Sequence, residues 1–145
     1  MEVYTIGFTQ KKAGQFFGKL NQAGIKRLVD VRLNNVSQLA GFAKRDDLEY
    51  FLKEICGAEY VHEGLLAPTK DILEAYKKKK GSWEQYERLF LQLMAERRIE
   101  EVLSPELFSV PTVLLCSEPT AQHCHRRLVL EYLQDKWGEL EVVHL

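Results

Sequence analysis

LLCSEPTAQHCHRRL, residues 114–128, is the stretch from which the fold and the candidate site can be worked out. It begins as an apolar run that stops at Cys116, as a buried strand does. Pro119 and Thr120 then restart the chain, and Thr120 is predicted to cap a helix that continues to about Trp137. In an α/β protein, such a turn lies at the carboxyl end of a parallel strand, where ligands usually bind. The sequence therefore predicts a site at this turn.

The rest of the chain alternates in the same way between short apolar runs and helical patterns. Besides the run that ends at Cys116, four runs predict strands, namely Val3–Ile6, Leu28–Val31, Glu59–His62 and Leu140–His144. Strands separated by helices throughout favour a mostly parallel sheet that is covered on both faces. We therefore predict a single α/β domain over residues 1–145, with about five strands and with helices on both faces of the sheet.

Helical spacing of apolar residues predicts the helices between these strands. Thr9 is placed to cap the first helix, which Gly24 ends. Capping-box spacing at Asp46 and Ser82 begins two others, and Thr69 opens one more. The expected apolar faces of these helices are Phe16, Phe17, Leu20 and Ala23, then Leu48, Phe51, Leu52 and Ile55, then Ile72, Leu73 and Tyr76, and finally Trp83, Tyr86, Phe90 and Leu93.

Composition narrows the class of protein. The chain is 46% hydrophobic and 28% charged, as globular proteins are, and its formal net charge of -1 gives no overall attraction to nucleic acid or membranes. No apolar run approaches the roughly 20 residues that cross a bilayer, and no export signal precedes Val3. Three cysteines, an odd count, argue against a disulfide framework. We expect a cytoplasmic protein with reduced thiols and no membrane partner.

Reactive side chains crowd the turn after Cys116. The positive end of the predicted helix would favour an anion, which Arg126 could help to bind, or a thiolate at Cys116. Glu118 could be a general acid or base, and His125 could orient a neighbour or shuttle a proton. The structural alternatives stay open: Cys116 and Cys124 packed as small hydrophobes, His125 bound only to a backbone carbonyl, and Glu118 interacting with the helix end.

A second group of candidates follows other predicted strands. Asp30 and Arg32 point to one side of their strand and could reach the same crevice as Glu118 and Arg126. The alternative is a structural Asp30–Arg32 ion pair. If the two arginines bind a ligand, their replacement by alanine should leave the melting temperature nearly unchanged, whereas a large loss would make them structural. A third wall of the crevice would come from Thr5, Gly7 and Thr9.

A zinc ion could bind at this turn, because Cys116, His123, Cys124 and His125 are all residue types that serve as zinc ligands. The spacing argues against it. His123 and His125 would point to different sides of a helix, and the chain has no C-x-x-C pair. We therefore expect no metal and no cofactor.

These residues together resemble the domain-of-unknown-function family 488. Its pattern opens with T-I-G-H-S, continues with D-V-R and a serine-bearing loop, and closes with L-C-x-E and C-H-R before a strand ending V-x-H. This chain has TIGFT from Thr5, DVR from Asp30 and CSEPTAQHCHR from Cys116. The resemblance covers nearly the whole chain and implies motif residues at Thr5, Gly7, Asp30, Arg32, Ser37, Cys116, Glu118, Cys124, His125, Arg126 and His144.

The chain departs from the family pattern in several places. Phe8 stands where the family often has histidine. If that histidine carries a proton in relatives, this chain cannot use it. Thr9 replaces serine, Gln38 replaces arginine, and the glycine pair expected around residues 65–68 is missing. The resemblance implies a fold and a set of site residues, and it includes Ser37 as a ligand-binding residue. It leaves the function open, because the family's name states no activity.

The function we favour from the sequence is a crevice that binds a phosphate-bearing ligand, either a nucleotide or a nucleic acid. Arg32, Arg126 and the helix end would hold the anion. If the protein is an enzyme, Asp30 or Glu118 would give hydrolase-like or transferase-like acid–base chemistry.

Two other functions stay open. In the first, Cys116 is the nucleophile of a cysteine enzyme and Cys124 resolves its intermediates, although the Cys-x5-Arg phosphate loop is absent because Gln122 stands at the arginine position. In the second, the protein is a non-catalytic nucleic-acid-binding module. Its basic surface and stacking rings would come from Lys70, Tyr76, Lys77–Lys80 and Trp83.

Overall fold

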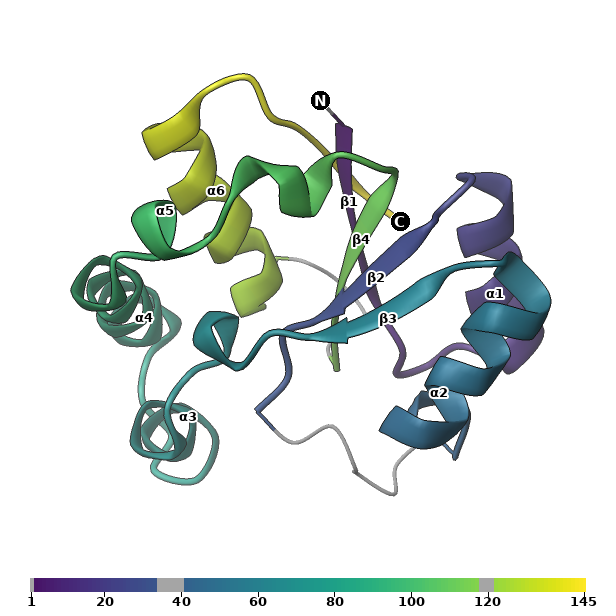
Figure 1. Ribbon diagram of the computed structural model, residues 1–145. Coiled ribbons are helices and arrows are strands. Elements are labelled where there is room, and N and C mark those ends of the chain that lie inside the picture. The colour runs from purple at the N-terminus through teal and green to yellow at the C-terminus, as the bar shows by residue number, and fades with distance from the viewer. Residues whose placement is uncertain (1, 34–40, 118–121) are drawn as a thin grey trace.

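Five parallel strands form one sheet in the order β3-β2-β4-β1-β5 (Figure 1). The structure is a computed structural model that describes residues 2–33, 41–117 and 122–145. The strands are β1 (Glu2–Gly7), β2 (Arg27–Asp30), β3 (Glu59–His62), β4 (Thr112–Cys116) and β5 (Glu141–His144). The predicted α/β class and the parallel sheet of about five strands are confirmed.

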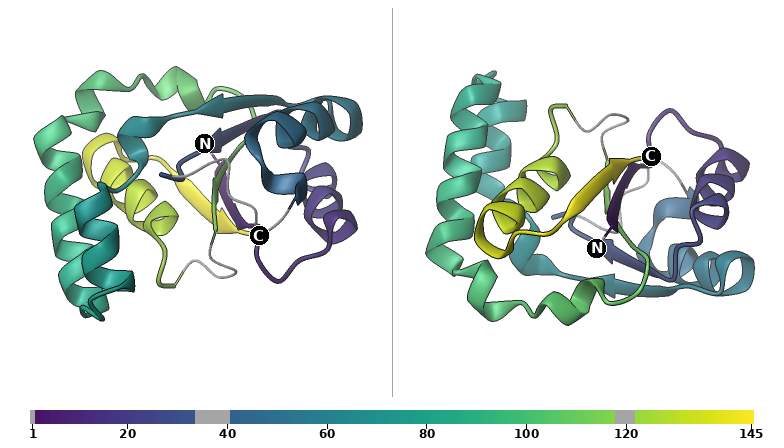
Figure 2. Two further views of the ribbon diagram at one scale, coloured as in Figure 1. Left: turned by 90° about the horizontal axis from the view of Figure 1, so that it is seen from below. Right: turned by 90° about the horizontal axis from the view of Figure 1, so that it is seen from above.

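Helices cover both faces of the sheet (Figures 1 and 2). On one face lie α1 (Ala13–Gln22) and α2 (Arg45–Phe51), and on the other lie α4 (Trp83–Arg97), α5 (Ile99–Val102) and α6 (His125–Trp137), with α3 (Lys70–Lys77) packed against α4. Short helical turns of other types lie at Gly41–Ala43, Leu52–Cys56, Gly64–Leu66 and Pro105–Phe108. No helix in these described ranges is both long enough and apolar enough to cross a membrane.

The central strand β4 divides the core into two halves. Leu114 and Cys116 point toward α4 and α6, whereas Val113 and Leu115 point toward α1 and α2. Every residue of β4 is buried, because its side chains alternate between two covered faces. This explains why the strand reads as an unbroken apolar run rather than as an alternating one.

Three helix starts differ from the sequence prediction. Lys12, not Thr9, is the N-cap of α1, because the Thr9 hydroxyl instead donates to the Ser117 carbonyl at 2.5 Å. Lys44, not Asp46, precedes α2. The helix expected to begin at Thr120, which lies outside the described residues, begins at His125. Cys124 has an extended backbone (φ -141°, ψ 141°), so the helix cannot include it.

Other local predictions are confirmed, with one further correction. Thr69 accepts a hydrogen bond from the Ile72 N–H at 3.2 Å, and Ser82 accepts one from the Gln85 N–H at 3.1 Å, so both residues cap their helices. Ile55 was expected on a buried face but is 46% exposed. The chain from Leu52 to Cys56 turns as a π-helix, which shifts Ile55 outward from the face set by α2.

The two-sided burial of β4 predicts a large cost for truncating Leu114. Leu114→Ala should lower the free energy of unfolding by about 2–5 kcal/mol, because it removes fully buried contacts and leaves a cavity. Denaturant unfolding monitored by circular dichroism measures the change. Val102, which is 59% exposed, is the control, and Val102→Ala should change stability by about 0.5 kcal/mol or less. Equal costs at the two positions would contradict this description of the core.

Candidate functional site

A pocket of about 220 Å³ lies where β2 and β4 end, on the side of the sheet that α4 and α6 cover. Arg32 and Leu33 enter it from the end of β2, and Cys116 and Ser117 from the end of β4. The rest of the wall comes from α3, α4 and the start of α6, through Tyr76, Lys77, Trp83, Tyr86, His123, Cys124 and His125, with Pro68 and Leu73 between them. The structure thus brings Arg32, Cys116 and His125 together, as the sequence predicted.

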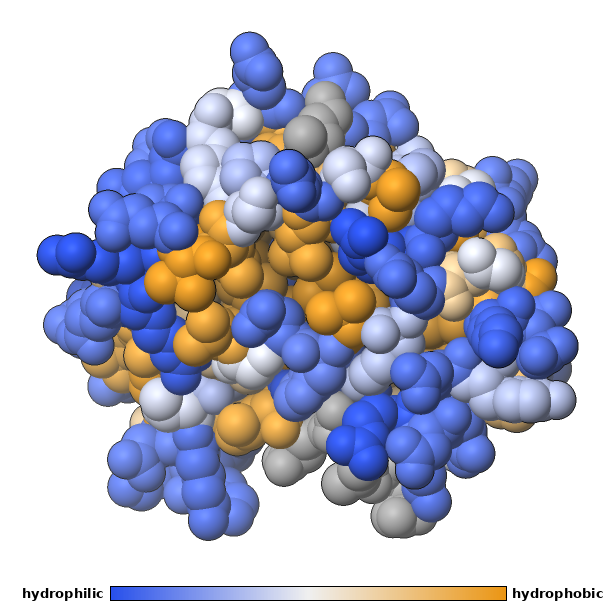
Figure 3. All heavy atoms as spheres, viewed as in Figure 1, coloured by the Kyte–Doolittle hydropathy of each residue, from blue (hydrophilic) through white to orange (hydrophobic). Residues whose placement is uncertain are grey.

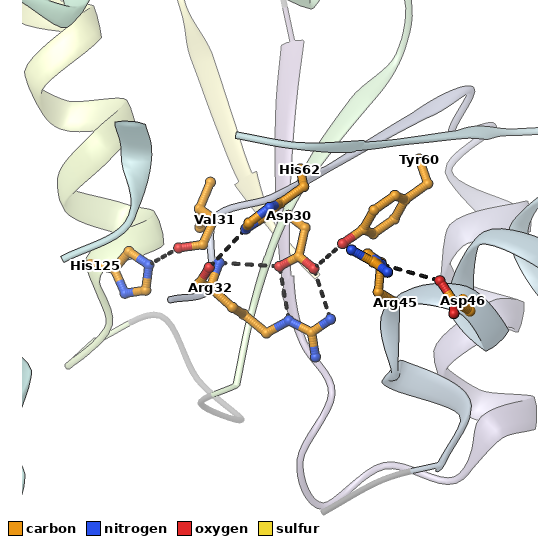
Figure 4. A network of polar contacts seen from close by, with 8 residues as sticks. All are labelled: Asp30, Val31, Arg32, Arg45, Asp46, Tyr60, His62 and His125. Carbon is orange, nitrogen blue, oxygen red and sulfur yellow. Dashed lines mark hydrogen bonds and ion pairs between the residues drawn. The ribbon is translucent and has the colours of Figure 1, made fainter. Parts of the chain in front are cut away.

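Asp30 and Arg32 form a buried ion pair at the end of β2 (Figure 4). The Arg32 Nε and Nη2 atoms each donate to a different oxygen of the Asp30 carboxylate at 2.8 Å. That carboxylate also accepts from the Arg32 backbone N–H at 3.1 Å and from the Tyr60 hydroxyl at 2.5 Å. A carboxylate has about four acceptor sites, so these bonds occupy its capacity. Asp30 is therefore placed to fix the Arg32 guanidinium.

Two histidines hold the backbone of the same segment (Figure 4). His125 Nε2 lies 2.7 Å from the Val31 carbonyl, and His62 Nε2 lies 3.2 Å from the Arg32 carbonyl. A carbonyl only accepts, so each Nε2 carries the proton. The backbone contact considered for His125 is therefore present, and it ties the start of α6 to the end of β2.

Phe8 packs beneath Arg32. The Arg32 Cζ atom lies 5.2 Å from the centroid of the Phe8 ring, and Phe8 is buried. The ring therefore offers its electron-rich face to the guanidinium, which is a cation–π contact. The Phe8 ring therefore helps to hold the Arg32 cation in place.

Cys116 and Cys124 are joined by a disulfide on the pocket wall. The expectation of reduced thiols is therefore wrong for this pair, while Cys56 is a free, buried cysteine. An odd cysteine count requires only that one thiol be unpaired, and the turn from β4 to α6 brings the other two together. Arg126 is fully buried beside them, and its Nη1 donates to the Cys116 sulfur at 2.9 Å.

The end of β1 lies beside this group but does not line the pocket. The Thr5 hydroxyl is 2.5 Å from His144 Nδ1, Gly7 pairs with Cys116 in the sheet register, and Thr9 binds Ser117. The third wall predicted from Thr5, Gly7 and Thr9 is thus a layer behind the pocket. Two other predicted site residues, Ser37 and Glu118, lie outside the described residues.

Aromatic rings form a column along the far wall. Trp83 stacks on Tyr86 with centroids 5.1 Å apart and on His123 with centroids 5.0 Å apart. Tyr86 continues the column to Phe90, and Tyr76 packs against Trp83 at 5.6 Å. The sequence treated Trp83 and Tyr86 mainly as core residues, which is correct for Tyr86, but both rings also face the pocket. The sequence pattern did not indicate that α3 and α4 lie beside the carboxyl ends of the strands.

Cationic groups cluster behind the disulfide. Burial lowers the pKa of His144, and the nearby charges of Arg126 and Arg127 lower it further. Burial also lowers the pKa of Lys11, assisted by Lys19 and Arg126. No group of three or more His, Cys, Asp or Glu side chains in the described chain is arranged to hold a metal.

Figure 3 shows the face seen in Figure 1, where charged and polar atoms surround apolar atoms gathered near the middle. The pocket residues themselves are mainly aromatic and apolar, with a few polar groups directed inward. Ligand-binding pockets share this pattern.

The buried ion pair predicts that Asp30→Asn destabilises the protein by about 3–5 kcal/mol, because the change leaves the Arg32 charge buried without its counter-charge. By the same reasoning, Arg32→Ala should lower stability, contrary to the small effect expected of a purely ligand-binding arginine. Chemical denaturation measures both changes. Asp46→Asn, at a side chain 85% exposed, is the matched control and should have little effect. A loss at Asp30 no larger than the control would refute the structural role of the pair.

The lowered pKa of His144 predicts that the stability of the protein depends on pH. Its folded-state pKa lies below the ordinary value of 6.5, so its contribution is present above about pH 6.5 and is lost as the pH falls toward the folded-state value. His144→Gln should therefore flatten the decline in unfolding free energy between about pH 7 and pH 5. Denaturant titrations of both proteins across that range give the comparison. Parallel curves would show that His144 is not perturbed by folding.

Comparison with protein families matches residues 12–133 to the family described as "Domain of unknown function DUF488". Searches of the curated proteins and of the solved structures returned no match. The family match spans most of the chain and includes the D-V-R segment, the disulfide and the start of α6.

Proposed function

We propose that this chain, which belongs to the DUF488 family, binds a small phosphate-bearing ligand, a nucleotide, in the pocket at the ends of β2 and β4. The observation that carries the proposal is the composition of the pocket wall, which combines two cationic side chains, Arg32 and Lys77, with aromatic rings. Each half of a nucleotide, the phosphate and the base, would find the chemistry that suits it.

The charge of the wall favours an anion. Arg32 and Lys77 both line the pocket. Asp30 balances the Arg32 charge but does not itself line the pocket, and none of the lining residues in the described part of the chain is an aspartate or glutamate. The first turn of α6 also borders the pocket, and its N-terminal end carries a partial positive charge. Because Asp30 and Phe8 fix the Arg32 side chain, little conformational entropy is lost when an anion binds there.

The rings favour a flat, unsaturated group beside the phosphate. Trp83 is already stacked on Tyr86 and His123, so a base would stack on the exposed His123 at the end of the column, on the wall that Tyr76 also lines. Stacking on protein rings contributes about 1–3 kcal/mol per base and tolerates any base. Recognition by these rings would therefore add affinity with little sequence selectivity.

The size of the pocket limits the ligand. Its volume of about 220 Å³ is below the roughly 300–1,000 Å³ of sites that enclose drug-sized molecules. It suits one nucleotide, or one nucleotide at the end of a strand, whose remainder stays in solvent. Lys78, Lys79 and Lys80 are exposed directly beyond Lys77, so a strand end is the second candidate that this surface favours.

In this proposal Asp30 is a positioning residue, because its acceptor sites are occupied by Arg32 and Tyr60. His125 likewise positions the end of β2 through the Val31 carbonyl. If the bound phosphate reacts, Glu118 would be the general acid or base, because it follows the pocket residue Ser117 in the chain. Arg126 acts from behind, on Cys116, rather than on the ligand.

Calorimetric titration with adenosine monophosphate tests the proposal. Lys77→Ala should raise the Kd about fivefold, corresponding to about 1 kcal/mol for an exposed charged hydrogen bond. His123→Ala should weaken binding of the nucleotide more than binding of inorganic phosphate, because it removes a ring on which the base would stack. Both side chains are exposed, so the variants should fold normally.

Lys79→Ala is the matched control, since Lys79 is exposed on the same lysine run but does not line the pocket. It should leave the Kd unchanged. No binding of adenosine monophosphate or phosphate by the native protein would refute the proposal. Preference for a short single strand, with a steep loss of affinity in salt and equal effects of Lys77→Ala and Lys79→Ala, would assign the surface to nucleic acid instead.

A further inference from the structure

We propose that Cys116 and Cys124 are a redox-active pair that carries out thiol–disulfide exchange with small disulfides that enter the pocket. This activity is independent of nucleotide binding, although both would use the same opening. It makes Cys116 the attacking thiol and Cys124 the resolving one.

The placement of the pair supports exchange with a small molecule. Cys116 is the last residue of β4, and Cys124 directly precedes α6. They are 1% and 3% exposed, yet both line the pocket. A protein partner therefore has little access to the sulfurs, whereas a molecule small enough to enter the pocket reaches them directly.

Arg126 distinguishes the two sulfurs. Its Nη1 donates to the Cys116 sulfur at 2.9 Å, and the side chain is fully buried, so the contact is held in place by packing. When the pair is reduced, a thiolate at Cys116 would accept this bond from a cation, which lowers the cost of ionisation.

The reaction balances with a low-molecular-weight disulfide as the oxidant. The Cys116 thiolate attacks one sulfur of that disulfide, forms a mixed disulfide and releases one small thiolate. Cys124 then loses its proton and attacks the Cys116 sulfur, which closes the Cys116–Cys124 bond and releases the second small thiolate. The small disulfide gains two electrons and the released thiolates take up two protons, while the protein changes from dithiol to disulfide.

Cys56 provides an internal reference. It is buried beneath α1, where its sulfur lies 3.9 Å from the Phe17 carbonyl, and it does not line the pocket. Burial raises the pKa of its thiol, although Lys26 partly opposes this. Cys56 should therefore remain unreacted in folded protein under conditions that modify Cys116.

Trapping the mixed disulfide tests the proposal. After reduction and desalting, Cys124→Ser should form a mixed disulfide with 2-hydroxyethyl disulfide at Cys116, located by mass spectrometry of peptides. In Cys116→Ser, modification of Cys124 should be at least about tenfold slower, because the Arg126 hydrogen bond described above is made to Cys116. Native protein under the same conditions should close its disulfide and release two molecules of 2-mercaptoethanol. Equal rates for Cys116, Cys124 and Cys56 would overturn the proposal.

The role of Arg126 is tested by rescue. Arg126→Gln should slow mixed-disulfide formation at Cys116 by about tenfold, while Arg126→Lys should retain most of the rate because it keeps the charge. If either buried substitution fails to fold, judged by circular dichroism, the comparison of the two cysteine variants decides the matter alone. Absence of exchange in a protein that still binds adenosine monophosphate would reject the redox pair and leave the proposed ligand site intact.

Discussion

The ion pair between Asp30 and Arg32 is the constraint on which the site depends. Two charges taken out of water are stable only when they are paired with good geometry, and this pair has two hydrogen bonds of 2.8 Å, with a third and fourth to the carboxylate. The end of β2 therefore cannot relax away from its position without exposing a buried charge to an apolar core. That rigidity keeps a guanidinium at the pocket wall whether or not a ligand is present.

The two halves of the site meet because β2 and β4 are neighbours in the sheet. Asp30 pairs in register with Leu115, so Arg32 and Cys116 emerge from the sheet within two residues of that pairing. The His125 ring links α6 to the end of β2 through its hydrogen bond to the Val31 carbonyl. One half offers a fixed cation and the other offers two sulfurs with a second buried arginine behind them. The parallel arrangement thus converts separate sequence motifs into a single chemical environment.

The sequence predicted the sheet, its parallel character and the meeting of Arg32, Cys116 and His125, since apolar runs and chain topology determine these features. It did not predict the partners that depend on three-dimensional proximity. Thr9 has the residue type of a helix cap, but a nearby carbonyl competes for its hydroxyl. The odd cysteine count led to the expectation of reduced thiols, and the Cys116–Cys124 bond was therefore not predicted. Tyr76 and Lys77 stood out as part of a possible nucleic-acid-binding surface, but the sequence could not place them beside Arg32 and Cys116, because their position depends on how α3 packs against α4.

A crystal structure of the protein with adenosine monophosphate tests the central claim most directly. The account predicts that the phosphate lies within hydrogen-bonding distance of the Arg32 guanidinium and that the adenine ring lies beside Tyr76 and His123. The Asp30–Arg32 pair should be unchanged, because the site is already formed in the free protein. A nucleotide bound elsewhere on the surface, with the pocket filled only by solvent, would contradict the account.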